Sequence, residues 1–341
     1  NLKATCDVLN GWGVTDQMEI TTVKYPKDHT YELDYQDIKG QKLAKRAAEV
    51  AVAGNHNMLM IGPPGAGKTM IAKRIPTILP PLTKEESMEL TKLYSIVGGL
   101  NANRPLILER PFREVHHTAT KSALIGGGLI PRPGEISLAD KGVLFLDEIA
   151  EFQKPVLEML RQPLEEHFIK IIRNRGVYHF PAEFLLVAAM NPCPCGNYPN
   201  LNKCLCTSTQ IQAYLSKISQ PLLDRIDICV EAERVAYEDL QGAREEYSKD
   251  IRERVIMARE RQKERYKGES ITTNSQLNAE KIKQYCILGN EEEKMMRQAF
   301  DKLNLTARMY HKILCVARTI ADLAGEEKIS LSHLREAIGY R

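Results

Sequence analysis

The chain has 341 residues, a formal net charge of +3 and 27% charged residues. This length can bury a large core and form two or three domains, and the near-neutral charge excludes a surface that is basic all over, so any nucleic-acid contact must be local. We recognise neither a membrane span nor a signal peptide, and we expect a cytoplasmic protein with no membrane partner. The eight cysteines are then expected to stay reduced or to bind metal.

Residues 1–30 carry scattered apolar side chains and the turn-like segment 10–13. This is too little apolar surface to fold alone. We therefore expect the first complete domain to begin near Tyr31.

A phosphate-binding loop follows at residues 62–69, with the spacing G-x-x-x-x-G-K-T. The apolar run 57–61 before it predicts a buried parallel strand, and residues 70–75 after it predict the start of a helix. Backbone N–H groups of such a loop surround phosphates, while Lys68 reaches the β- and γ-phosphates and the Thr69 hydroxyl a bound Mg²⁺. The expected nucleotide contacts are Gly62, Pro63, Pro64, Gly65, Ala66, Gly67, Lys68, Thr69 and Met70.

A second motif of the same site is the apolar run 143–146, which ends in Asp147 and Glu148. A buried strand would deliver both carboxylates beside the phosphate loop, where Asp147 holds Mg²⁺ through water and Glu148 polarises the attacking water. Strands often end in solvated carboxylates, so the pair alone is weak evidence. Together with the loop, it favours ATP hydrolysis over nucleotide binding alone.

The remaining elements divide the chain into an α/β part and a helical part. Short apolar strands alternate with helices over residues 31–231, as in an open parallel sheet, with further strands at 184–190 and 226–230. After Glu231 the pattern becomes helical, first over 237–266, with Ile251, Val255, Ile256 and Met257 on one buried face, and then in several helices over 278–340. We expect an ATPase core at 31–231 and a helical lid at 232–341.

Residues 168–180 predict a β-hairpin with a basic tip. The segments 168–172 and 177–180 are rich in β-branched and aromatic residues, and Asn174 and Gly176 supply the turn. Lys170, Arg173 and Arg175 are candidates to bind nucleic-acid phosphates.

Four cysteines, Cys193, Cys195, Cys204 and Cys206, form the pattern C-x-C-x₈-C-x-C. Four thiolates satisfy tetrahedral Zn²⁺ in a closed structural site. The C-x-C spacing is tighter than that of the usual zinc knuckle, so free thiols and a redox-sensitive pair remain open as alternatives.

Segments 123–128, 131–139, 189–196 and 221–227 together resemble the magnesium-chelatase-like AAA+ ATPases, with the best match to their ComM (YifB) branch. The resemblance extends from about residue 35 to residue 340. It implies a P-loop AAA+ core with a parallel sheet flanked by helices, followed by an all-helical lid. Members of this branch carry an N-terminal Lon-protease-like domain, of which residues 1–30 look like the end.

The resemblance also implies roles for three further residues. Asn191 matches sensor 1, which orients the attacking water, although an Asn at a strand end can simply cap a turn. Arg225 looks like the arginine finger that reaches a neighbouring subunit's γ-phosphate; the alternative is an ion pair with Asp224 or Asp227. Arg308 matches sensor 2 of the lid, the alternative being an ordinary surface arginine.

In related helicases the hairpin before sensor 1 points into the pore of a ring. The resemblance assigns that place to residues 168–180 and adds a companion insert at 126–135 with Arg132 at its tip. Alternatively, both inserts serve only in contacts between subunits. The four cysteines at 193–206 lie between Asn191 and Arg225 in the sequence, where a bound metal would brace the catalytic interface. For His116 and His117 we expect a structural or pore-facing role.

These features together favour a ring-forming ATPase, most simply a homohexamer, with ATP, ADP and DNA as partners. The resemblance implies helicase or branch-migration activity in the uptake and recombination of transforming DNA. Two alternatives use the same ATPase: a subunit of a metal chelatase, and a protein remodeller.

Overall fold

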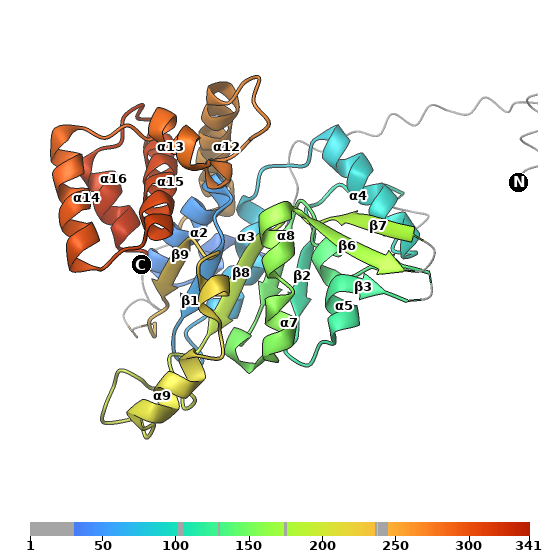
Figure 1. Cartoon of the computed structure of the whole chain (residues 1–341), viewed down its shortest axis with the longest axis horizontal. Coiled ribbons are helices and arrows are strands. Elements are labelled where there is room, and N and C mark those ends of the chain that lie inside the picture. The colour runs from blue at the N-terminus through green and yellow to red at the C-terminus, as the bar shows by residue number, and fades with distance from the viewer. Residues whose placement is uncertain (1–30, 101–104, 129, 174–175, 236, 238–244) are drawn as a thin grey trace, which may run out of the picture.

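The computed structural model describes residues 31–100, 105–128, 130–173, 176–235, 237 and 245–341. Its centre is a five-stranded sheet in the order β2-β5-β8-β1-β9 (Figure 1). The strands are β1 Met58–Ile61, β2 Phe112–Val115, β5 Val143–Leu146, β8 Leu185–Met190 and β9 Ile228–Glu231. Every neighbouring pair is parallel, so the predicted α/β fold is confirmed. The expectation for residues 1–30 lies outside the described residues.

Helices cover both faces of this sheet, which explains why β5 and β8 are buried along their whole length. On one face, Met58 and Met60 of β1 join a core with helices α2 and α3, while Leu59 points into a second core on the other face. The helices that contribute to the second core include α7, α9 and α10. The helices and 3₁₀ turns between residue 31 and the last strand of the sheet are η1 Tyr35–Asp37, α2 Lys42–Gly54, α3 Lys68–Ile78, α4 Lys84–Ile96, α5 Lys121–Ile125, α6 Glu135–Leu138, η2 Ile149–Glu151, α7 Lys154–Glu158, α8 Arg161–Glu166, α9 Ser208–Leu215 and α10 Gln220–Leu223.

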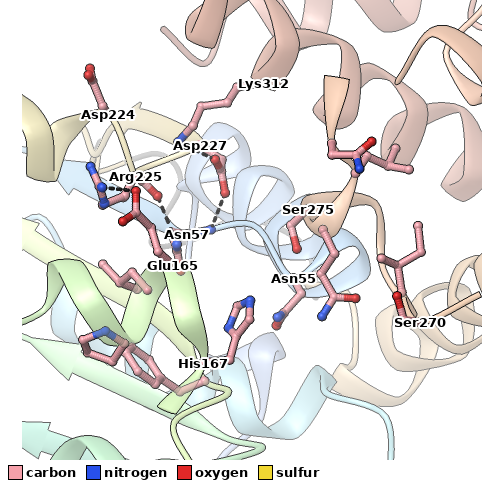
Figure 2. A pocket seen from close by; sticks show the side chains of 17 residues that line it. Asn55, Asn57, Glu165, His167, Asp224, Arg225, Asp227, Ser270, Ser275 and Lys312 are labelled. Atoms are coloured by element: carbon pink, nitrogen blue, oxygen red, sulfur yellow. Dashed lines mark hydrogen bonds and ion pairs between the residues drawn. The ribbon is translucent and has the colours of Figure 1, made fainter. Parts of the chain in front are cut away.

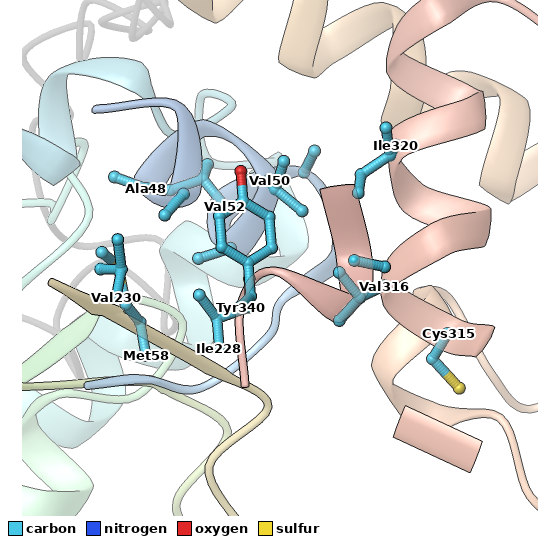
Figure 3. Packing of buried hydrophobic residues seen from close by; sticks show 14 of the residues in the cluster. Ala48, Val50, Val52, Met58, Ile228, Val230, Cys315, Val316, Ile320 and Tyr340 are labelled. Atoms are coloured by element: carbon cyan, nitrogen blue, oxygen red, sulfur yellow. The ribbon is translucent and has the colours of Figure 1, made fainter. Parts of the chain in front are cut away.

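The C-terminal part is helical, as predicted. It contains α12 Ser248–Arg265, η3 Asn274–Gln276, α13 Ala279–Tyr285, α14 Asn290–Lys302, α15 Ala307–Ala324 and α16 Leu331–Ile338. Its apolar residues continue the first core: Val316 and Ile320 of α15 pack with Val52 of α2 and with Tyr340 (Figure 3). The Cys229 N–H donates to the Tyr340 carbonyl at 2.9 Å, which ties this part to β9.

Two details of the predicted helix 237–266 were wrong. Residues 245–247 are not helical, and α12 begins at Ser248. Met257 is exposed, whereas the buried stripe consists of Ile251, Val255, Ala258 and Gln262. These positions recur every three or four residues, and Met257 lies about 200° from Val255 around the helix axis, outside the stripe.

Two short antiparallel inserts stand beside the sheet. The predicted hairpin is confirmed as β6 Phe168–Arg173 paired with β7 Gly176–Pro181. The insert after α5 forms a second hairpin, β3 Gly126–Gly127 with β4 Arg132–Pro133. The two touch, since a Cβ at Gly127 would lie 3.0 Å from Nη2 of Arg173. None of the helices among the described residues is both long and apolar enough to cross a bilayer.

Candidate functional site

Residues 62–67 lead from the carboxyl end of β1 into α3. Gly65 and Gly67 have φ angles of 77° and 85°, and the space that a Cβ would occupy at each is open. This left-handed conformation favours glycine. Gly67 is the N-cap and has no side chain with which to cap the helix, so the first N–H groups of α3 and the positive end of its dipole are open to an anion.

Lys68 connects the loop with the end of β8. Its Nζ donates to the carbonyls of Gly62 and Pro63 at 2.6 and 3.0 Å and to Oδ1 of Asn191 at 3.2 Å. Burial lowers the pKa of Lys68, and the negative charges of Asp147 and Glu148 oppose this shift. The structure thus brings Lys68 and Asn191 together, as the proposed sensor-1 role of Asn191 requires.

The two carboxylates after β5 have different surroundings. Asp147 accepts a hydrogen bond from the Thr69 hydroxyl at 2.8 Å. Glu148 has a positive φ of 51°, and its side chain is 53% exposed. The Asp147 carboxylate therefore lies at the start of α3, and the Glu148 side chain is accessible to water.

This donor set fits Mg²⁺ and a nucleotide. Mg²⁺ prefers oxygen ligands and keeps several waters, and the Thr69 hydroxyl and Asp147 carboxylate supply adjacent oxygens beside an anion-binding helix terminus. Lys68 adds a positive charge on the same edge of the sheet. The arrangement can bind a polyphosphate and place a carboxylate base next to it.

Two further residues lie near this site: His117, for which we expected a structural or pore-facing role, and Gln41, which the sequence analysis did not single out. His117 follows β2, and its Nδ1 lies 3.9 Å from Oε2 of Glu148. Gln41 precedes α2 and donates through Nε2 to the carbonyls of Ala66 and Glu233. Adjacency of β2 and β5 in the sheet could have pointed to His117, but no local pattern distinguishes Gln41.

Arg225 lies at the opposite edge of the sheet. Its carbonyl accepts from Nδ2 of Asn57 at 3.0 Å, just before β1, whereas the phosphate loop follows β1. Four residues of strand span about 13 Å. Arg225 therefore does not meet the phosphate loop of its own chain.

The Arg225 guanidinium is paired in this structure with Glu165 of α8, and not with Asp224 or Asp227, which the sequence had suggested as alternative partners (Figure 2). Its Nη1 also donates to the Pro221 carbonyl at 2.5 Å, and Nε is buried without a partner among the described residues. Glu165 and Arg225 line a cavity of about 510 Å³ between the α/β part and the C-terminal helical part.

Two more charged groups lie at this edge. Arg308, at the start of α15, has a side chain that is 66% exposed, and its Nη1 lies 3.5 Å from Oδ2 of Asp224. Lys312 Nζ lies 2.7 Å from Oδ1 of Asp227, whose side chain is 12% exposed. Arg308 thus contacts Asp224, the residue before Arg225 in the chain, and neither arginine contacts Lys68.

The candidate DNA residues lie on the two hairpins, but Arg132, which we expected at the tip of its insert, lies in strand β4 and pairs with Gly127. Lys170 and Arg173 of β6 and Arg132 of β4 are exposed, while Ile169 and Ile171 face the second core. Arg175 lies outside the described residues. The apolar face of β6 thus anchors the hairpin, and its basic residues face solvent.

The four predicted cysteine ligands meet in one cluster. Cys193, Cys195, Cys204 and Cys206 each place Sγ within 4.8 Å of the other three. All of them are free thiols. Hydrogen bonds from the backbone N–H groups of Asn197 and Leu205 lower the pKa of Cys195 to about 6, whereas burial and the neighbouring thiols raise the pKa values of Cys204 and Cys206. Cys195 is therefore the thiol that most readily takes the thiolate form that metals bind.

Comparison with known proteins agrees with this geometry. Residues 34–240 match the family model "Magnesium chelatase, subunit ChlI", and residues 245–341 match that of its C-terminal part. Competence protein ComM of Haemophilus influenzae is 47% identical over 311 residues, which cover 91% of this chain and 60% of that protein. YifB of Salmonella typhimurium is 40% identical over the whole chain, which spans 66% of its length. The chain therefore belongs to the magnesium chelatase family, within which it is a ComM-like AAA+ ATPase.

Proposed function

We propose that this chain is the motor part of a ring-forming enzyme, a homohexamer, that hydrolyses ATP and acts on single-stranded or branched DNA. One relative is named a competence protein, and we infer a role as helicase or branch-migration motor in the uptake and recombination of transforming DNA. We place this activity in the cytoplasm. Residues 31–231 form the proposed core and 232–341 the lid, and a structural Zn²⁺ at Cys193, Cys195, Cys204 and Cys206 completes the cofactors.

The contacts around Lys68 support the proposed chemistry of ATP. The N-terminus of α3 binds the phosphates, and Lys68, which now donates to two loop carbonyls and Asn191, transfers these hydrogen bonds to phosphate oxygens. Mg²⁺ held at Thr69 and Asp147 supplies positive charge that offsets the charge of the phosphates. Glu148 accepts the proton of the attacking water, and Asn191 orients that water.

The position of Arg225 supports a ring. An arginine that stabilises the transition state must reach a γ-phosphate, and Arg225 lies at the amino edge of its own sheet, beyond the length of β1 from its own loop. A neighbouring subunit must therefore supply the phosphate. Arg308 lies at the same edge, and we propose that it acts on that same neighbouring nucleotide.

The observation that carries the DNA proposal is the contact between the two hairpins. Arg173 of β6 lies against Gly127 of β3, and Lys170 and Arg132 are exposed on the same pair of inserts. Gly127 pairs with Arg132 in the β3–β4 register, so Arg132 and Arg173, from two separate segments, adjoin on a protein whose net charge is only +3. Such a local surface binds a phosphate backbone through charge and without base readout.

The family model names a magnesium chelatase subunit, which makes metal insertion into a tetrapyrrole the second candidate function. A protein remodeller is the third. Neither function needs exposed basic residues at the hairpin tips, and neither predicts an ATPase rate that responds to DNA.

The test replaces both arginines of the hairpin tip, as Arg173→Ala with Arg175→Ala. We expect wild-type affinity for single-stranded DNA to fall with salt, with a slope of about −0.7 per phosphate neutralised. The double variant should bind DNA more weakly, show a flatter slope and lose the stimulation of ATPase by DNA. Its ATPase rate without DNA should remain, because Lys68, Asp147 and Glu148 are unchanged.

A matched control removes two exposed basic residues of α14, as Arg297→Ala with Lys302→Ala. This control has the same net charge but intact hairpins, so its DNA affinity and salt slope should remain those of the wild type. Unchanged DNA binding and stimulation in the hairpin variant would contradict the DNA proposal. A wild-type rate that rises with a tetrapyrrole chelatase partner and not with DNA would support the chelatase function.

A further inference from the structure

The spacing of the four thiols in the cysteine cluster matches a tetrahedral metal site. Sγ of Cys193 lies 3.4 Å from that of Cys195 and 3.8 Å from that of Cys204, and the Cys195–Cys204 distance is 3.7 Å. Zinc–sulfur bonds of about 2.3 Å in a tetrahedron place the sulfurs about 3.8 Å apart. With Cys206, the cluster already has the shape of a four-thiolate zinc site.

Nearby donors complete the surroundings of such a site. The Tyr198 N–H donates to Sγ of Cys193 at 3.4 Å, and Nδ2 of Asn197 to Sγ of Cys195 at 3.8 Å. Hydrogen bonds of this kind orient metal ligands and stabilise the charge on thiolates. The other described cysteines, Cys229, Cys286 and Cys315, do not belong to the cluster.

The loop that carries the thiols, residues 193–206, has little apolar packing of its own. Leu201 and Leu205 are 82% and 90% exposed. A cavity of about 520 Å³ also separates part of the loop from the start of the phosphate loop. Burial of these two side chains does not hold the loop in place, and a cross-link by metal would add to the hydrogen bonds within the loop.

Chain connectivity and two contacts link this loop to the end of β8, to the phosphate loop and to the segment after β9. Cys193 is two residues after Asn191, which accepts the hydrogen bond from Lys68. Gly196 lies against Pro64 so closely that a Cβ there would be 2.5 Å from Pro64 Cδ. Nη2 of Arg234 donates to Oδ1 of Asn197 at 3.4 Å.

We propose that a zinc ion bound by Cys193, Cys195, Cys204 and Cys206 holds loop 193–206 against the phosphate loop and thereby sets the affinity for nucleotide. The inference rests on the proposed ATP site. The zinc is structural: its four positions are filled by protein, so it binds no substrate. Loss of the metal releases Gly196 from Pro64 and Asn191 from its position at Lys68, and the freed residues must then be ordered again when nucleotide binds.

The first experiment measures zinc and nucleotide binding on one preparation. The purified chain should hold about one zinc per chain. Removal of zinc with a strong chelator under reducing conditions should weaken the binding of a fluorescent ADP by about tenfold or more, and added zinc should restore it. Cys204→Ser with Cys206→Ser should behave like the metal-free protein and should not respond to zinc.

A second variant tests the contact without touching a ligand. Gly196→Ala keeps all four thiols but places a methyl group on Pro64, so it should retain zinc and lose nucleotide affinity. Gly268→Ala is the matched control, because Gly268 also has a positive φ, 86°, but open space around its Cβ position. It should change neither zinc content nor nucleotide affinity.

The outcomes separate the parts of the proposal. Absence of zinc in chain prepared without chelator would overturn the metal site. Bound zinc with equal ADP affinity in the metal-free and metal-bound protein, and in Gly196→Ala, would overturn the control of nucleotide binding. A wild-type chain with zinc that binds no ADP would overturn both this inference and the proposed ATP site.

Discussion

The two edges of the central sheet hold different parts of the proposed ATPase site. At the carboxyl edge, Lys68 contacts Asn191 at 3.2 Å and Thr69 contacts Asp147 at 2.8 Å. At the amino edge, Arg225 is paired with Glu165, and its charge is directed at a partner within the chain. The residues at the carboxyl edge are already arranged for a ligand, whereas Arg225 must lose its ion pair with Glu165 before it can contact one.

We interpret this difference as two complementary half-sites of the proposed ring-forming enzyme. Parallel strands place everything that follows them at one edge and everything that precedes them at the other. A residue before β9, such as Arg225, cannot join a loop after β1 in the same subunit. The expected consequence is that catalysis depends on contact between the carboxyl edge of one subunit and the amino edge of the next.

The largest expected effects, on ATPase rate and nucleotide affinity, come from single substitutions at one edge of the sheet. Glu148→Gln should bind ATP and stop turnover, whereas Lys68→Ala should lose nucleotide affinity. Arg225→Ala should bind ATP normally and lose about 10³- to 10⁵-fold in rate. Steady-state ATPase assays together with binding of a fluorescent nucleotide measure both quantities.

Mixing Arg225→Ala with Glu148→Gln protein then tests whether the edges meet between subunits. A mixed interface can join an intact arginine to an intact base, so part of the rate should return. If no ratio of the two variants restores activity, a shared site is contradicted. Lys68→Ala mixed with Glu148→Gln serves as a control, because both lesions lie on the same edge and no mixed interface regains a complete carboxyl edge.

The second prediction concerns the stability of the amino edge. The Asp227 side chain is 12% exposed; burial by itself raises its pKa, but Lys312 and His56 outweigh this and hold the pKa well below its usual value. Asp227→Asn leaves Lys312 without its partner and should lower the free energy of unfolding by about 3 kcal/mol at pH 7. Chemical denaturation measures this loss.

The same group predicts a pH dependence. Because the folded-state pKa of Asp227 is lowered, its contribution is fully present above the unfolded value of about 4 and disappears as the pH falls toward the lower folded value. The difference between wild type and Asp227→Asn should therefore shrink below pH 4. Asp224→Asn, whose partner Arg308 is exposed, should cost far less at any pH.

The smallest expected effect is on the availability of Arg225. Glu165→Gln removes the charge that now pairs with it, and since the Glu165 side chain is 56% exposed, the pair contributes about 1 kcal/mol or less. We expect the ATPase rate to rise a few-fold at subunit concentrations that limit assembly. Glu166→Gln, which removes the neighbouring exposed charge, is the matched control. A fall in rate with Glu165→Gln alone would indicate that the ion pair positions Arg225 and does not restrain it.

Much of the fold was predictable because the signals are local. The glycines of the phosphate loop, the apolar runs of β1, β5 and β8 and the β-branched residues of the hairpin each specify their own backbone conformation. Where the pattern was weaker, the prediction was wrong, as at residues 245–247, which are not helical, and at Met257, which is exposed.

The sequence by itself determined the phosphate loop, the two carboxylates after β5, the basic hairpin and the set of four cysteines, since each depends on residues that are close along the chain. Only the tertiary structure decided which of these groups meet. Lys68 and Asn191 are 123 positions apart, and Arg225 and Glu165 are 60 positions apart. Their contacts depend on the order of the strands in the sheet and on which edge each loop occupies, and spacing within a segment carries no information about that order.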